Sequence, residues 1–118
     1  MRVLIIGASS KPDRYAYKAT ERLIDAEIEV YLLGNREGVV LNQKIETKMP
    51  ENDSIDTVTM YVGPKHQEQY STKLVDLSPR RVIFNPGTEN ILLQELLESK
   101  GIEVVVNCTL VMLSFKNL

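Results

Sequence analysis

The sequence predicts an α/β protein with a doubly wound parallel sheet of about five strands and helices on both faces. Three observations carry this prediction. Short runs rich in β-branched residues recur along the chain, stretches with helical spacing of apolar residues lie between them, and loops containing glycine or proline follow most of the runs. Such runs, when they lack strict polar alternation, are typical of strands buried on both faces of a parallel sheet.

Five segments are expected to form the strands. Four are apolar and one is rich in Thr, Val and Tyr; in chain order they are residues 3–6, 30–33, 57–62, 82–84 and 102–106. Because helical patterns separate several of these runs, the strands are expected to be joined by crossover helices that cover the two faces of the sheet.

Three helices are expected between the strands. The first two show apolar residues at helical spacing, at Ala16, Ala19, Leu23 and Ala26 and then at Tyr70, Leu74 and Leu77. The third has a wide apolar stripe at Leu92, Leu93, Leu96 and Leu97.

The third helix also carries end signals. Thr88 and Glu89 are expected to open it as cap and first-turn acid, and Gly101 is expected to follow its last residue.

Residues 34–56 are the irregular part of the chain. Turn formers, including Asn52 and Asp53, surround an apolar patch at residues 39–41. We interpret this part as a loop with a short strand pair or one weak helical turn, rather than a full crossover helix. The chain shows no internal repeat and no low-complexity segment.

Length and composition exclude several classes of protein. The chain has 118 residues and a net charge of −2. It therefore suits a single domain over residues 1–118, without a basic surface for nucleic acid or for a membrane. No apolar stretch approaches the roughly 20 residues of a membrane span, and the start lacks the pattern of a signal peptide. One Cys and one His exclude a disulfide framework and a Cys-rich or two-His metal site. We expect no metal and a cytoplasmic setting.

Ligands of doubly wound sheets bind beyond the carboxyl ends of the strands, where the strand order reverses. The segments that follow the five runs are therefore the candidates for a binding site: residues 7–12, 34–36, 63–65, 85–88 and 107–109. Four of the five contain Gly and three contain Pro. Small residues let a ligand approach the backbone closely.

The first loop, residues 7–12, has the features of a phosphate site. It leads into a helix expected to begin near Arg14, where unpaired amide groups attract anions. Ser9 and Ser10 add hydroxyl groups, and Lys11 adds positive charge. A tight strand-to-helix turn with solvated charges explains the same residues. Gly7 is its only glycine, so the glycine spacing of dinucleotide dehydrogenases is absent.

The second loop suggests which nucleotide would bind. NAD enzymes place an acidic residue here for the ribose hydroxyls, whereas Glu27 and Glu29 lie at the opposite end of the run. Arg36 instead suits a ribose phosphate, which coenzyme A (CoA) and NADP both carry. A solvated loop arginine is the alternative.

Three blocks together resemble a known family. They are residues 7–15, the Phe-Asn-Pro-Gly-Thr-Glu stretch at residues 84–89, and the block at residues 107–113 that begins Asn-Cys-Thr. In this order, over nearly the whole chain, they resemble the stand-alone CoA-binding proteins, small bacterial proteins similar to the N-terminal CoA-binding domain of the succinyl-CoA synthetase alpha subunit. The resemblance implies a Rossmann-like fold that binds CoA or an acyl-CoA in a groove across the strand ends.

The resemblance also implies roles for particular residues. In the synthetase domain the first loop cradles phosphates, the residues after the second strand hold the nucleotide, and those after the third and fourth strands line the pantetheine path. By position, the roles pass first to Gly7, Ala8, Ser9, Ser10 and Arg14, then to Gly34, Asn35 and Arg36, and last to Tyr61, Gly63, Pro64, Asn85, Pro86 and Gly87. This chain has less glycine in its first loop and no second domain with a phosphorylated histidine, so ligase activity is not carried over.

Cys108, after the fifth run, completes the candidate binding residues and is the obvious nucleophile. Its activation needs a base or cation, and His66 is the only histidine able to approach it. A buried apolar cysteine, a structural histidine, or a regulatory disulfide of Cys108 with CoA are the alternatives. Tyr15 and Tyr61 either pack on the ligand or belong to the core and rim. We expect no catalytic residue.

Three functions therefore stand as hypotheses. The first is a module that binds CoA or an acyl-CoA without catalysis of its own. The second is an NADP-dependent oxidoreductase, which Arg36 favours. The third is a regulatory or interaction subunit of an acyl-CoA enzyme, or a homo-oligomer, which the apolar residues 110–113 and Phe115 favour if they do not fold back on the core.

Overall fold

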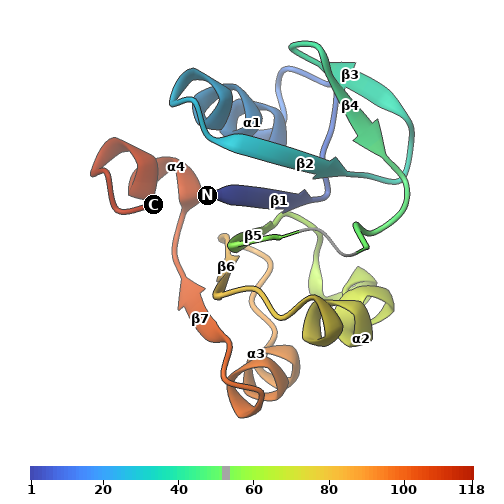
Figure 1. Ribbon diagram of the computed structural model, residues 1–118, viewed down its shortest axis with the longest axis vertical. Coiled ribbons are helices and arrows are strands. Elements are labelled where there is room, and N and C mark those ends of the chain that lie inside the picture. The colour runs from blue at the N-terminus through green and yellow to red at the C-terminus, as the bar shows by residue number, and fades with distance from the viewer. Residues whose placement is uncertain (52–53) are drawn as a thin grey trace.

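A seven-stranded sheet forms the centre of the molecule (Figure 1), as seen in a computed structural model that describes residues 1–51 and 54–118. The turn prediction for Asn52 and Asp53 lies outside these residues. The strands follow the order β3-β4-β2-β1-β5-β6-β7, and all neighbouring pairs are parallel except β3 with β4. Their bounds are β1 (Arg2–Ile6), β2 (Glu29–Leu33), β3 (Gly38–Val40), β4 (Gln43–Glu46), β5 (Thr57–Met60), β6 (Arg81–Phe84) and β7 (Glu103–Val106).

The two strands beyond the predicted five come from the irregular part of the chain. β3 and β4 form the short strand pair that was one of two interpretations of residues 34–56, and no helix lies between them. The hairpin joins the main sheet because Leu32 and Leu33 of β2 pair with Ile45 and Glu46 of β4. The prediction of a doubly wound parallel sheet is confirmed, with seven strands instead of about five.

Helices cover both faces of the sheet, as predicted (Figure 1). α1 (Tyr15–Asp25) and α4 (Thr109–Ser114) pack together on one face, while α2 (Glu68–Leu77) and α3 (Ile91–Ser99) pack together on the other; a 3₁₀ turn, η1 (Pro64–His66), precedes α2. Strand side chains alternate between the faces. Val3 and Ile5 thus join the core under α1, whereas Leu4 and Ile6 join the core under α2 and α3.

The start of α3 differs from the prediction. Its cap is Asn90, whose side-chain oxygen accepts a hydrogen bond from the Leu93 amide at 3.2 Å. Thr88 and Glu89 instead belong to the preceding turn. The buried Thr88 hydroxyl donates to the Asn85 carbonyl, and the Glu89 carboxylate accepts from the Gly87 amide.

The predicted apolar stripe of α3 is only half buried. Leu93 and Leu97 are buried, whereas Leu92 is 81% exposed and Leu96 38% exposed. The helix packs on the sheet through one narrow face, so two of the four leucines are enough to fill it. Gly101 follows the helix with φ +80°, as predicted for the residue after a helix end.

The terminal apolar block is divided between core and surface. In α4, Met112 is buried and Leu113 packs against the core under α1, which is the expected folding back. Val111 in α4 and Phe115, which directly follows the helix, stay exposed. Within the described residues, no helix is long and apolar enough to cross a membrane.

Candidate functional site

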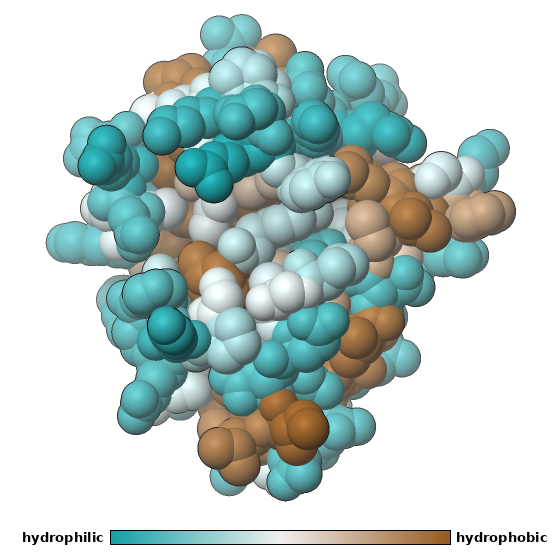
Figure 2. Space-filling view, turned by 180° about the vertical axis from the view of Figure 1, so that it is seen from behind, coloured by the Kyte–Doolittle hydropathy of each residue, from teal (hydrophilic) through white to brown (hydrophobic). Residues whose placement is uncertain are grey.

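A pocket of about 560 Å³ lies beyond the carboxyl ends of β1, β2, β5 and β6, next to the point where the chain changes direction across the sheet. Figure 2 shows a hollow across the middle of the face seen from behind, with strongly hydrophilic residues along one side of it. The pocket is lined by Gly7, Ala8, Ser9, Ser10, Lys11, Arg14, Tyr15, Ala16, Gly34, Asn35, Arg36, Glu37, Ile45, Tyr61, Val62, Tyr70, Pro86 and Thr88.

The first loop is held against its neighbours by close backbone contacts. The amides of Gly7 and Ala8 both donate to the Leu33 carbonyl at 2.9 Å. Gly7 has φ +96°, and a Cβ there would lie 3.0 Å from atoms of Tyr61 and Val62. The sequence needs glycine here because a side chain would push the first loop away from the opposite wall.

Gly34 is equally constrained. A Cβ at Gly34 would lie 2.7 Å from the Ala8 carbonyl oxygen, so this residue lets the first and second loops touch. The two glycines together bring three strand ends to one pocket.

Anion-binding groups remain available in the first loop. Among the described residues, no hydrogen bond uses the amide of Ser9 or Ser10, while the Ser9 hydroxyl accepts from the Lys11 amide at 3.1 Å. No side chain caps α1, whose first-turn amides therefore lack a side-chain acceptor. Free amides at a helix start attract an anion.

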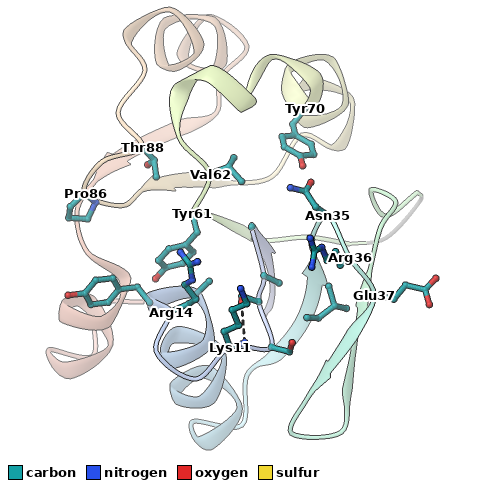
Figure 3. Close-up of a pocket in the computed structure, with 18 residues that line it drawn as sticks. Lys11, Arg14, Asn35, Arg36, Glu37, Tyr61, Val62, Tyr70, Pro86 and Thr88 are labelled. Atoms are coloured by element: carbon teal, nitrogen blue, oxygen red, sulfur yellow. Dashed lines mark hydrogen bonds between the residues drawn. The ribbon is translucent and has the colours of Figure 1, made fainter.

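The charged side chains of the pocket are mostly cationic. Lys11 and Arg14 come from the first loop and Arg36 from the loop after β2, and Figure 3 shows all three directed toward the cavity. Glu37 points away from it (Figure 3). Three cations around one cavity favour a ligand with several negative charges.

The opposite wall is formed by Tyr61, Val62, Tyr70, Pro86 and Thr88 (Figure 3). Burial raises the pKa of Tyr61 to about 12, and burial also raises the pKa of Tyr70. Both phenols are therefore neutral at physiological pH, and neither serves as a base there. This wall offers apolar surface and neutral polar groups.

Asn85 lies behind this wall and not in it. It is 3% exposed, and its side-chain amide donates to the Thr59 hydroxyl at 2.7 Å and to the Met60 carbonyl at 2.9 Å. Its side-chain oxygen accepts from the Thr109 amide at 2.8 Å. Asn85 therefore ties β5, β6 and the start of α4 together.

Four other predicted residues also lie outside the pocket lining: Gly63, Pro64, Gly87 and Cys108. Gly63 directly precedes the turn η1, Pro64 begins it, and Gly87 follows β6 with φ +91°. Cys108 is half-buried just before α4, and His66 is exposed in η1. The remaining predicted residues, those of the first two loops with Tyr61 and Pro86, line the pocket together.

Two further lining residues had been considered from the sequence: Lys11 as a positive charge of the first loop, and Tyr15, for which packing on the ligand was one of two interpretations. Thr88 was not named as a ligand contact, although it lies in a segment that follows a strand. Ile45 and Tyr70 had no such signal, because Ile45 comes from the added hairpin and Tyr70 has the spacing of an ordinary core position of α2. Within residues 1–51 and 54–118, no group of three His, Cys, Asp or Glu side chains suits a metal ion.

The fold and the pocket define a Rossmann-like α/β protein with a cationic cavity at its strand ends. Residues 1–114 match the model of a family described as the CoA binding domain, and the chain belongs to this family. No curated protein matches the sequence.

Solved structures share the fold. A crystal structure of an uncharacterized protein is 44% identical, with a TM-score of 0.96 and coverage of 99% of this chain and 97% of the other. A hypothetical protein from Pyrococcus horikoshii OT3 is 23% identical, with a TM-score of 0.86 and coverage of 97% and 81%.

A larger enzyme contains a similar domain. An acetyl-coenzyme A synthetase from Ca. Korarchaeum cryptofilum, solved with phosphate and ADP, is 16% identical with a TM-score of 0.74. The match covers 90% of this chain but only 25% of that one, so the likeness concerns one part of the enzyme and shows the fold alone.

Proposed function

We propose that this protein binds coenzyme A or an acyl-CoA in the strand-end pocket. The observation that carries the proposal is the convergence of Lys11, Arg14 and Arg36 on one cavity in a chain of the CoA-binding domain family. CoA carries a diphosphate and a ribose 3′-phosphate, and three cations match such a ligand in charge.

The two walls suit the two halves of CoA. In this arrangement the diphosphate lies over the first loop, near the free amides of Ser9 and Ser10, and the 3′-phosphate lies at Arg36. The uncharged pantetheine arm then follows the neutral wall, along Tyr61 and Pro86. This order of contacts agrees with the chemical difference between the walls.

We propose a binding role without catalysis by this chain. Tyr61 and Tyr70 are neutral phenols at physiological pH, and Cys108 and His66 do not line the pocket. The pocket thus holds groups that bind and orient a ligand, and lacks an activated nucleophile or base among its described residues.

Calorimetry with CoA, dephospho-CoA and NADP tests the proposal. We expect CoA to bind, and Arg36→Gln to weaken CoA about tenfold, or about 1.4 kcal/mol, while dephospho-CoA changes little. Arg22→Gln is the matched control, since Arg22 is an exposed arginine in the last turn of α1 and does not line the pocket.

Absence of CoA binding at millimolar concentration would rule the proposal out. Tighter binding of NADP than of CoA would replace it with the oxidoreductase hypothesis. Equal loss of CoA and dephospho-CoA affinity in Arg36→Gln would remove the role given to Arg36.

A further inference from the structure

Gln67 is a glutamine with no exposed surface. Long polar side chains are seldom fully buried, and a buried amide is costly unless its donors and acceptor are paired. The amide nitrogen of Gln67 donates to the Val62 carbonyl at 2.9 Å and to the Thr88 carbonyl at 2.7 Å, and its side-chain oxygen accepts from the Asn90 side-chain amide at 3.0 Å. Each polar atom of the side chain is therefore paired.

These bonds join two separate segments of the pocket wall. Val62 follows β5 and Thr88 follows β6, and both line the pocket on the same side (Figure 3). The third partner, Asn90, caps α3. Gln67 thus connects both wall segments and the start of a helix through one amide.

Beyond the ends of β5 and β6, no other hydrogen bond within residues 1–51 and 54–118 connects these two wall segments. β5 and β6 stop pairing at Met60 and Phe84, and the bonds from the Asn85 side chain to the β5 segment reach Thr59 and Met60, at the level of the strand ends. Beyond that level the Gln67 side chain alone bridges the gap by hydrogen bonds.

We infer that Gln67 is a positioning residue, which holds the neutral wall at a fixed spacing before a ligand arrives. The inference rests on the proposed function, since the ligand portion next to this wall is the pantetheine arm. A preformed wall lowers the ordering cost of binding, so loosening it weakens the ligand that extends along it. A ligand confined to the cationic side keeps its affinity.

The test compares CoA with adenosine 3′,5′-bisphosphate, which lacks the pantetheine arm. Gln67→Met keeps the length of the side chain and removes its three hydrogen bonds. We expect it to weaken CoA about tenfold and to change the bisphosphate by less than about twofold. Gln69→Met is the matched control, because Gln69 is an exposed neighbour whose amide reaches only the His66 carbonyl, and we expect no change for either ligand.

A second variant covers the case in which Gln67→Met does not fold. Asn90→Ser keeps an oxygen for capping α3 but loses the amide that donates to Gln67. Here we expect a smaller CoA-selective loss of about threefold, with faster hydrogen exchange of the amides at residues 62–66 and 87–90.

The outcomes separate the two proposals. Equal loss of both ligands, or unchanged CoA affinity in a folded variant, overturns the role of Gln67 and leaves the proposed function standing. A wild-type protein that binds neither ligand overturns the proposed function and the role of Gln67 with it.

Discussion

On one side of the pocket, Lys11, Arg14 and Arg36 carry charge on loops whose side chains make few bonds inside the protein. On the other side, Gln67 and Asn85 lie behind the wall with every donor of their amides paired. The two walls therefore make different contributions to the site. The cationic wall keeps its groups free for a ligand, while the neutral wall uses its polar groups to hold its own shape. Substitutions on the first wall should therefore change affinity with little effect on stability, whereas substitutions behind the second wall should also change stability.

The largest expected effect is on stability, at Asn85. Asn85→Ala removes three buried hydrogen bonds, to the Met60 carbonyl, the Thr109 amide and the Thr59 hydroxyl, and leaves the Thr59 hydroxyl only its bond with the Thr109 hydroxyl. We expect a loss of about 3 kcal/mol in the free energy of unfolding, measured by urea denaturation. Asn35→Ala on the exposed loop of the cationic wall is the control, with a change below about 0.5 kcal/mol. Similar losses of unfolding free energy in Asn85→Ala and Asn35→Ala would contradict the stated difference between the two walls.

Two glycines offer the next largest effect. Both Gly7 and Gly87 have positive φ, but a Cβ at Gly7 would lie 3.0 Å from Tyr61 and Val62 atoms, whereas a Cβ at Gly87 meets nothing within 4 Å. We expect Gly87→Ala to cost about 1 kcal/mol from backbone strain alone, and Gly7→Ala to cost about 2 kcal/mol or more. Thermal unfolding measures both. A larger loss of stability in Gly87→Ala than in Gly7→Ala would show that the close contact of Gly7 with Tyr61 and Val62 adds nothing to the cost of a side chain.

The cationic wall is tested at Arg14. This residue stands at the start of α1 without capping it by its side chain. Arg14→Gln should weaken CoA about fivefold, with the loss shrinking as salt is raised, because screening already weakens the attraction. The free energy of unfolding should stay within about 0.5 kcal/mol of the wild type. If Arg14→Gln lowers the free energy of unfolding as much as the free energy of CoA binding, Arg14 also stabilises the fold, and the stated difference between the walls is wrong.

The smallest expected effect concerns how the free energy of unfolding falls at alkaline pH, and it is tested at Tyr61 of the neutral wall. Burial raises its pKa to about 12 from the usual 10.0, so the unfolded chain releases the phenol proton first as the pH rises. The stability linked to Tyr61 is therefore fully present below about pH 10 and is lost as the pH rises toward 12. Tyr61→Phe should lose less stability than the wild type across this interval in denaturation series. If the free energy of unfolding falls equally with pH in Tyr61→Phe and in the wild type, burial of the phenol is contradicted.

Much of the fold was predictable from local pattern. The five β-branched runs became β1, β2, β5, β6 and β7, because a strand buried on both faces must be apolar along its length. The hairpin of β3 and β4 was only one of two interpretations. Its place in the sheet depends on pairing with β2, which is a contact between distant segments that local spacing does not encode.

The site was predictable where it follows strand ends directly. The first two loops were predicted and line the pocket, because a doubly wound sheet brings parallel strand ends to one edge. Asn85 and Cys108 also follow strands, but the network around Thr59 and Thr109 draws Asn85 behind the wall, and α4 begins directly after Cys108. Whether a side chain faces the cavity depends on such partners.

Local pattern in the sequence was enough to predict β1, β2, β5, β6 and β7 and the helices α1, α2 and α3 in their order, the glycine-containing loops at the strand ends, and the cations placed on them. These follow from residue types and their spacing along the chain. The meeting of Lys11, Arg14 and Arg36 at one cavity became visible only in the folded molecule, as did the role of Gln67 and Asn85 as structural links of the opposite wall. The role of a buried polar side chain depends on its hydrogen-bond partners, and these partners come from segments far away in the chain.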